Sequence, residues 1–204
     1  MKRLTLLLSL VGVLLAVSMS EAGSHYVIIL DGANENPPHS TLGTGSGVVD
    51  IDTIGNNLHV NVTFSGLTSN TIMAHIHCCI APPGNTIVAT PLPAFPGFPL
   101  GGTSGSYDGV LDMTQTSSWN PAFIAAHGGT TSGAEAALAS GALAGQAYFN
   151  IHTTNFPGGE IRAFLVLTPE GPTEGIPTLS GWALLALGVL LALSTLFYLR
   201  KRPA

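Results

Sequence analysis

The sequence is poor in positive charge. Six of its 204 residues are lysine or arginine, against eleven aspartates and glutamates. Five of these six cations lie in the first three or the last five positions, so that Arg162 is the one cation between Gly23 and Gly175. This central segment holds ten acidic residues and carries a formal charge of −9. Because binding to nucleic acids depends on lysine and arginine, the imbalance excludes a nucleic-acid-binding protein.

Cysteine is also scarce, with one adjacent pair, Cys78 and Cys79. In an exported protein such residues are expected to be oxidised or metal-bound. The sequence leaves three alternatives: a strained disulfide between the two neighbours, bonds to other chains, or thiolate ligation of a metal beside His77. No further cysteine exists for an ordinary internal bridge.

Long apolar runs occur at the two ends of the chain. Lys2 and Arg3 precede an uncharged apolar stretch over residues 4–17, and the small residues Ser20 and Ala22 follow. A basic start, an apolar centre and small residues before a cleavage site are typical of a secretory signal peptide. We therefore expect residues 1–22 to be a signal peptide and the protein to be exported.

The second apolar run covers residues 179–199 and ends at the basic cluster 200–202. At 1.5 Å per residue it is roughly 31 Å long, about the thickness of the hydrocarbon core of a bilayer. The run predicts a C-terminal transmembrane helix with its basic tail on the cytoplasmic side and the acidic domain outside. Residues 168–175 form an acidic linker between the domain and this helix.

Short β-strands dominate the expected domain at residues 23–167. Apolar alternation and turn residues rich in glycine and asparagine mark them, which favours a β-sandwich or barrel. Residues 80–102 contain six prolines and predict a long loop that covers the domain or a site. Two short alanine-rich helices are expected at 120–127 and 132–143. The expected strands are 25–30, 47–52, 58–64, 71–77, 107–114, 145–153 and 160–167.

Three histidines form the candidate metal site. His75 and His77 are two residues apart on an expected strand, so both side chains leave the same face. If the strand that carries His152 is a neighbour, three imidazoles converge, which is a ligand set that suits zinc or copper. A shared ion requires ring nitrogens about 3–4 Å apart. The alternative is three structural, hydrogen-bonded histidines.

The other histidines and the lone interior cation are assigned structural roles. His59 falls on a polar strand face and His127 at a helix C-terminus, while His25 and His39 lie at the edges of strands or loops. Arg162 is expected to pair with a carboxylate and to hold the last strand in place, because an unpaired charge on a half-buried sheet is costly.

The residues before the C-terminal apolar run resemble a known sorting signal. Ile176, Pro177, Thr178, Leu179, Ser180 and Trp182, followed by the apolar run and a basic tail, resemble the bacterial IPTL-CTERM signal. The resemblance implies processing by an exosortase-type membrane transpeptidase. It also implies a Gram-negative envelope protein or secreted product. The alternative is a plain membrane anchor.

The histidine segments carry a second resemblance. The run from Ala74 to His77, the run from Tyr148 to Thr153, and the run from Gly158 to Arg162 resemble the CHRD family, named after chordin. Membership implies an immunoglobulin-like β-sandwich over about residues 25–167 and no established biochemical activity. The His-x-His strand is also similar to the copper-ligand strand of Cu/Zn superoxide dismutase, but the ligands of that enzyme's zinc loop are missing.

Two functional hypotheses follow. In the first, the chain is an exported cell-envelope protein, membrane-anchored or released, whose domain is a non-enzymatic interaction or structural module. In the second, it is an extracytoplasmic protein that binds copper or zinc through His75, His77 and His152, with redox activity as an extension. Cys78 and Cys79 are further candidate ligands. The expected partners are an exosortase-type enzyme, the membrane and a component of the envelope or matrix.

Overall fold

The computed structural model describes residues 23–168, and these form an antiparallel β structure with two short helices. The all-β prediction with two helices is therefore confirmed. The strands are β1 (Ser24–Asp31), β2 (Thr44–Asp52), β3 (Asn57–Ser65), β4 (Thr71–Cys78), β5 (Gly105–Asp112), β6 (Ala147–Thr153), β7 (Ile161–Phe164) and β8 (Val166–Leu167); the helices are a 3₁₀ turn (Thr116–Ser118), α1 (Pro121–Ala126) and α2 (Thr131–Leu143).

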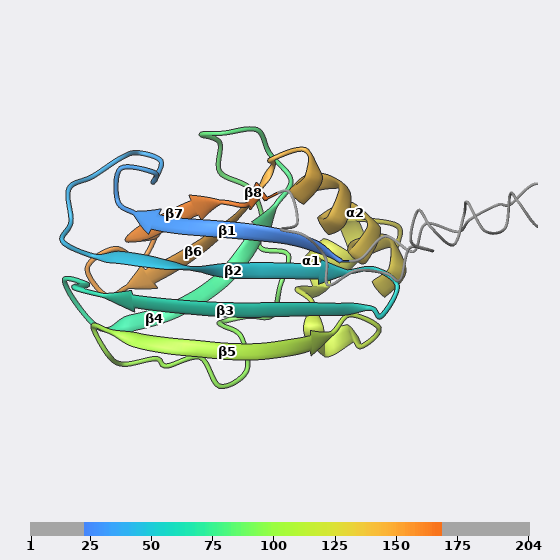
Figure 1. Ribbon diagram of the computed structural model, residues 1–204, viewed down its shortest axis with the longest axis horizontal. Helices are drawn as coiled ribbons and strands as arrows, with labels where there is room; N and C mark the ends of the chain where they lie inside the picture. Colours follow the sequence, from blue (N-terminus) through green and yellow to red (C-terminus); the bar gives the residue numbers. More distant parts are fainter. Residues whose placement is uncertain (1–22, 169–204) are drawn as a thin grey trace, which may run out of the picture. The chain divides into compact units, whose positions relative to one another are not determined.

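All strands belong to one curled antiparallel sheet. Its order is β4-β6-β7-β1-β2-β3-β5, and β8 pairs with β1 beside this path. Figure 1 shows the curl: β4 and β6 run behind β1, β2 and β3 and cross them diagonally. The curled sheet is a half-barrel, and its two ends form two layers that face each other across the core. Each layer has an inner face toward the core and an outer face away from it.

Strand β3 illustrates how the sequence produces this core. Leu58, Val60, Val62 and Phe64 alternate with polar residues, and all four are at most 2% exposed. Successive side chains of a strand point to opposite faces, so the apolar set enters the core together. Full burial of each such side chain stabilises the fold by about 1.5–3 kcal/mol. The same alternation in β1 and β2 supplies their share of the core.

The two helices begin where the sequence provides caps. The Asn120 side chain accepts a hydrogen bond from the backbone N–H of Ala122, and Pro121 occupies the first helical turn of α1. The Thr130 side chain accepts from the N–H of Gly133 at the start of α2. These caps satisfy backbone donors that a helix leaves free at its N-terminus. Both helices lie at one end of the curled sheet (Figure 1).

The last expected strand, 160–167, is divided in the structure. β7 pairs with β6, and β8 pairs with β1. Between them, the backbone N–H of Leu165 still bonds to the carbonyl of Ala147 in β6. β7 also pairs with β1 at Arg162, so the chain keeps β1 as its neighbour while its pairing with β6 ends, which an apolar pattern does not encode.

Several predictions concern segments outside residues 23–168. They are the signal peptide at 1–22, most of the linker, the sorting signal at 176–204 and the transmembrane helix at 179–199. Within residues 23–168, no helix has the length and apolar character needed to cross a membrane. The described residues form eight strands and two helices around one hydrophobic core.

Candidate metal centre

Strands β4 and β6 bring the three predicted histidines together. They pair in antiparallel register, with His75 opposite Asn150, His77 opposite Tyr148 and Met73 opposite His152. Directly opposed residues share a face, so all of these side chains leave the outer face of the sheet. The expectation that the two strands are neighbours is confirmed.

A proline-rich loop closes the exposed edge of β4 beside this cluster. The backbone N–H of Cys78 bonds to the carbonyl of Ile87, and that of Ala89 bonds to the carbonyl of Ile76. The hydroxyl of Thr90 accepts the N–H of Ile76. The expected proline-rich loop therefore packs against the domain, and it also extends the sheet by isolated bridges, which its six prolines did not predict. The loop contacts the cluster through the carbonyl of Thr86, which bonds to His77, and His75 and His152 are 2% and 5% exposed.

The ring nitrogens of the cluster are arranged asymmetrically. Nδ1 of His77 donates to the carbonyl of Thr86 at 2.7 Å, and Nδ1 of His152 donates to the carbonyl of Pro157 at 3.0 Å. Each bond holds the proton on Nδ1 and leaves Nε2 with a free lone pair. Within residues 23–168, Nε2 of both rings and Nδ1 of His75 are buried without a hydrogen-bond partner.

The three rings lie close together. One ligand atom from each histidine lies within 4.8 Å of the others. The His75 ring centroid is 4.6 Å from that of His152 and 4.8 Å from that of His77. The spacing is somewhat wider than the 3–4 Å expected for nitrogens that already share an ion, so the rings would have to move inward to bind one.

Burial holds the cluster in its neutral form. Loss of solvation, with a smaller contribution from the neighbouring imidazoles, lowers the pKa of His75 to about 2. Burial also lowers the pKa of His77 to about 4, against the opposing hydrogen bond to Thr86. The pKa of His152 is lowered by burial as well. Neutral imidazole is the form that binds metals, so the three rings are ready ligands at neutral pH.

Arg162 secures the loops around the cluster. Its guanidinium donates to the carbonyls of Asn34, Pro83 and Gly84 and to the side-chain oxygen of Asn85. The Arg162 Nε is 3.8 Å from a carboxylate oxygen of Glu35, and the side chain is fully buried. The expected carboxylate partner is therefore present, but it comes from a loop, and most of the bonds go to backbone carbonyls.

The two cysteines form a vicinal disulfide on the other side of the strand. Cys78 is bonded to Cys79, and its side chain enters the core together with Ala74 and Ile76. His77 lies on the opposite face, and the carbonyl of Ala137 in α2 is 3.4 Å from the Cys79 sulfur. Thiolate ligation beside His77 does not fit this arrangement, because both sulfurs are in the disulfide.

Comparison with known families agrees with these segments. Residues 26–165 match the CHRD domain family, which covers more than half of the chain. The chain belongs to the CHRD family. Residues 175–202 match the IPTL-CTERM motif, and the two matches together fit an exported surface protein sorted by an exosortase-type system. Neither the curated proteins nor the solved structures give a significant match.

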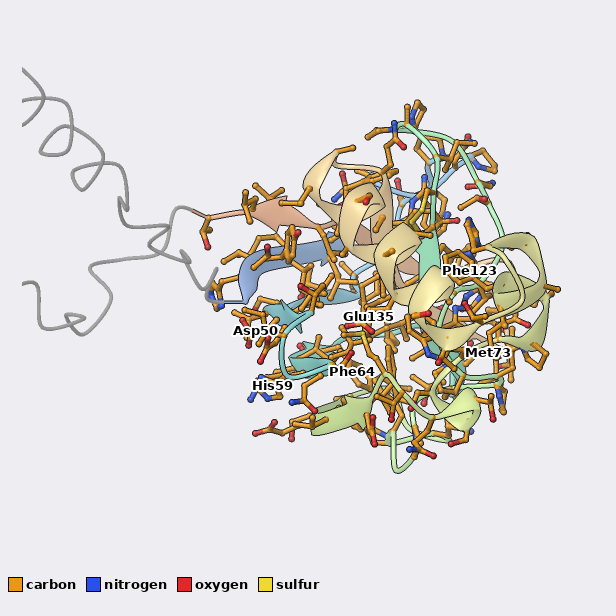
Figure 2. All side chains as sticks on the ribbon, turned by 90° about the vertical axis from the view of Figure 1, so that its right-hand side faces the viewer. Asp50, His59, Phe64, Met73, Phe123 and Glu135 are labelled. Atoms are coloured by element: carbon orange, nitrogen blue, oxygen red, sulfur yellow. A yellow bond between two sulfur atoms is a disulfide. The ribbon has the colours of Figure 1, made fainter. Side chains whose placement is uncertain are left out.

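A second group of titratable residues crosses the outer face of the other layer of the CHRD domain. The carboxylate of Asp50 bonds to Nδ1 of His25 and, at 2.9 Å, to Nδ1 of His59. Nε2 of His59 is 2.7 Å from a carboxylate oxygen of Asp108. Figure 2 shows Asp50 next to His59, on the opposite side of the domain from Met73. We call these four residues the His-Asp ladder.

The sequence interpretation did not identify this ladder, although the hairpin pattern was enough to predict that Asp50 and His59 are neighbours. The hairpin turn at 53–57 sets the register that places Asp50 opposite His59. The pKa of His59 is raised, first by its bond to Asp50 and then by its bond to Asp108. His25 and Asp108 join this pair because β1 and β5 flank the β2–β3 hairpin. That arrangement follows from the order of strands in the sheet.

Proposed function

We propose that this chain is an exported surface protein whose CHRD domain binds one copper or zinc ion through His75, His77 and His152. The observation that carries the proposal is the set of three buried ring nitrogens without hydrogen-bond partners. A buried polar atom without a partner lowers the stability of the fold by about 1–3 kcal/mol. Three such atoms in one cluster indicate a site for a ligand. The carbonyl bonds at Nδ1 are the outer-shell contacts typical of metal-binding histidines.

The role we propose is binding without turnover. His75 and His152 are 2% and 5% exposed, and the proline-rich loop closes the edge of β4. A substrate would have to displace this cover to reach the ion, whereas a single ion needs only a brief opening of the loop. Storage, buffering or structural use of the ion on the cell surface fits such a site better than catalysis does.

The test is metal analysis of residues 23–175, which include every strand and helix described above. After incubation with copper or zinc and desalting, we expect about one equivalent of bound metal, and a large loss of it in the His75→Ala/His77→Ala variant. The matched control is His127→Ala, because His127 lies outside the cluster and bonds to the carbonyl of Phe123. Less than a tenth of an equivalent in the unmodified domain would overturn the proposal and leave a metal-free interaction or structural module.

We also propose that residues 179–199 hold the protein in the membrane until an exosortase-type enzyme removes the sorting segment. The match at 175–202 and the run of 21 uncharged residues support this step. Intact-mass measurement of the protein from its native envelope is expected to show loss of the residues beyond the 176–182 region. A chain that still ends at Ala204 would contradict processing.

A further inference from the structure

Met73 lies on the same strand face as the histidine cluster. Residues 73, 75 and 77 alternate along β4, and Met73 is opposite His152 on β6, next to a register shift between residues 71 and 73. The Cβ atoms of such a pair are about 4.5–5.5 Å apart, and a methionine side chain has three rotatable bonds. Met73 and His152 are therefore cross-strand neighbours on this face, and the flexible thioether is a candidate for a further ligand beside the three rings.

The cluster supplies no negative charge to an ion. The group consists of three histidines, and two of them are almost fully buried. The buried carboxylate of Glu35 accepts a hydrogen bond from the amide of Asn150, which is opposite His75. Glu35 also lies beside the Arg162 guanidinium. These two opposite charges offset each other, so the charge of a bound ion would stay uncompensated.

Aromatic contacts through Tyr148 connect the Arg162–Glu35 pair to the cluster. The His77 ring stacks on Tyr148 with centroids 4.5 Å apart, and the Arg162 guanidinium carbon is 4.7 Å above the Tyr148 ring. The cost of placing an ion in a medium of low dielectric constant rises with the square of its charge. For a dication this cost is about four times that of a monocation, so a buried site of neutral ligands favours the lower charge.

We infer that the site is selective for copper(I), with Met73 as a fourth, soft ligand beside His75, His77 and His152. Thioether sulfur selects copper(I) over zinc, and imidazole binds both. The inference depends on the proposed metal-binding function and specifies the ion and an additional ligand. Copper(I) also brings a single positive charge to a site that contains no anionic ligand.

The experiment compares ion affinities of the full-length protein in a nonionic detergent. Copper(I) is supplied under anaerobic conditions by competition with a chromophoric copper(I) chelator, and zinc by competition with a zinc-binding dye. The test variant is Met73→Leu, which keeps the volume but removes the sulfur. Its matched control is Met113→Leu, since Met113 is buried in the core at 1% exposure.

We expect Met73→Leu to lower the copper(I) affinity by about tenfold or more while the zinc affinity changes by less than about threefold. Met113→Leu leaves both affinities unchanged. X-ray absorption of the copper(I)-loaded protein is expected to show a sulfur neighbour that is absent in Met73→Leu. The cysteine sulfurs do not contribute, because they are bonded to each other.

The outcomes distinguish the role of Met73 from the proposed metal-binding function. If the unmodified protein binds neither ion, the proposed function is wrong, and the inference is wrong with it. If both ions bind and Met73→Leu lowers both affinities equally or neither, the metal site stands and the role of Met73 is refuted. A copper(I) spectrum with nitrogen neighbours alone would refute it in the same way.

Discussion

The histidine cluster predicts an unusual effect of removing a candidate ligand. His75 is 2% exposed, and its Nδ1 has no partner. Because an unpartnered buried polar atom costs about 1–3 kcal/mol, an apolar side chain of similar size removes a penalty from the ion-free domain. We expect His75→Leu to raise the free energy of unfolding by about 1 kcal/mol once imperfect packing is included. The midpoint of thermal unfolding should rise by about 2–4 °C.

Zinc should reverse this order. An ion that binds the folded state alone stabilises it by about 2.7 kcal/mol when its free concentration is 100 times the dissociation constant. The unmodified domain keeps all three ligands and gains this amount, whereas His75→Leu has lost one of the three and gains much less. The free energy of unfolding is therefore expected to increase from the ion-free domain to His75→Leu, and from His75→Leu to the zinc-bound domain.

Urea unfolding of residues 23–175 measures all three states. Trp119 is the single tryptophan of this fragment, and its 3% exposure makes its fluorescence a reporter of unfolding. The titrations are made without reductant, with EDTA or with excess zinc, and His127→Leu serves as the control that should keep the zinc response. Two results would refute the reasoning: an equal zinc response in domain and variant, or a loss of more than about 1 kcal/mol in EDTA caused by His75→Leu.

Three further predictions concern other parts of the domain. Arg162→Met should destabilise it by about 3–5 kcal/mol in urea unfolding, because a buried carboxylate and several loop carbonyls lose their partner. His59→Gln should lower the free energy of unfolding by less than about 2 kcal/mol, since the two ion pairs of His59 are half-exposed. Because the pKa of His59 is raised above 6.5, that loss should be full below pH 6.5 and should shrink as the pH rises through the folded-state pKa. Gly141→Ala should lower the unfolding midpoint, because its new Cβ would lie 2.3 Å from the Cys78 sulfur and 2.5 Å from the Cys79 sulfur.

Each of these has a control and a contrary result. Arg162→Lys keeps the positive charge but lacks the several N–H donors of the guanidinium, so it should lower the free energy of unfolding less than Arg162→Met does. A lysine variant as stable as the unmodified domain would contradict the role of the loop carbonyls. For His59→Gln, a deficit that grows above pH 7 would reverse the expected sign. Ser140→Ala is the control for the helix, since Ser140 is exposed and alanine favours helices. A midpoint unchanged by Gly141→Ala would show that α2 does not press against the disulfide.

The amino-acid sequence by itself determined which residues of a strand share a face. The alternation in β3 and β4 is local, because successive side chains of a strand must point to opposite sides. It was enough to place His75 and His77 on one face and to predict strands and helices close to the observed ones. The caps at Asn120 and Thr130 are equally local, since each satisfies backbone groups within three residues.

The tertiary structure decided which strands are neighbours, and with that the chemistry of each outer face. The approach of His152 to His75 requires β6 to pair with β4 across about 75 residues of chain. The His-Asp ladder requires β1 and β5 to flank the β2–β3 hairpin. The partner of Arg162 is set by two loops far away in the sequence. Such contacts depend on the order of strands in the sheet, which the local period of a sequence does not encode.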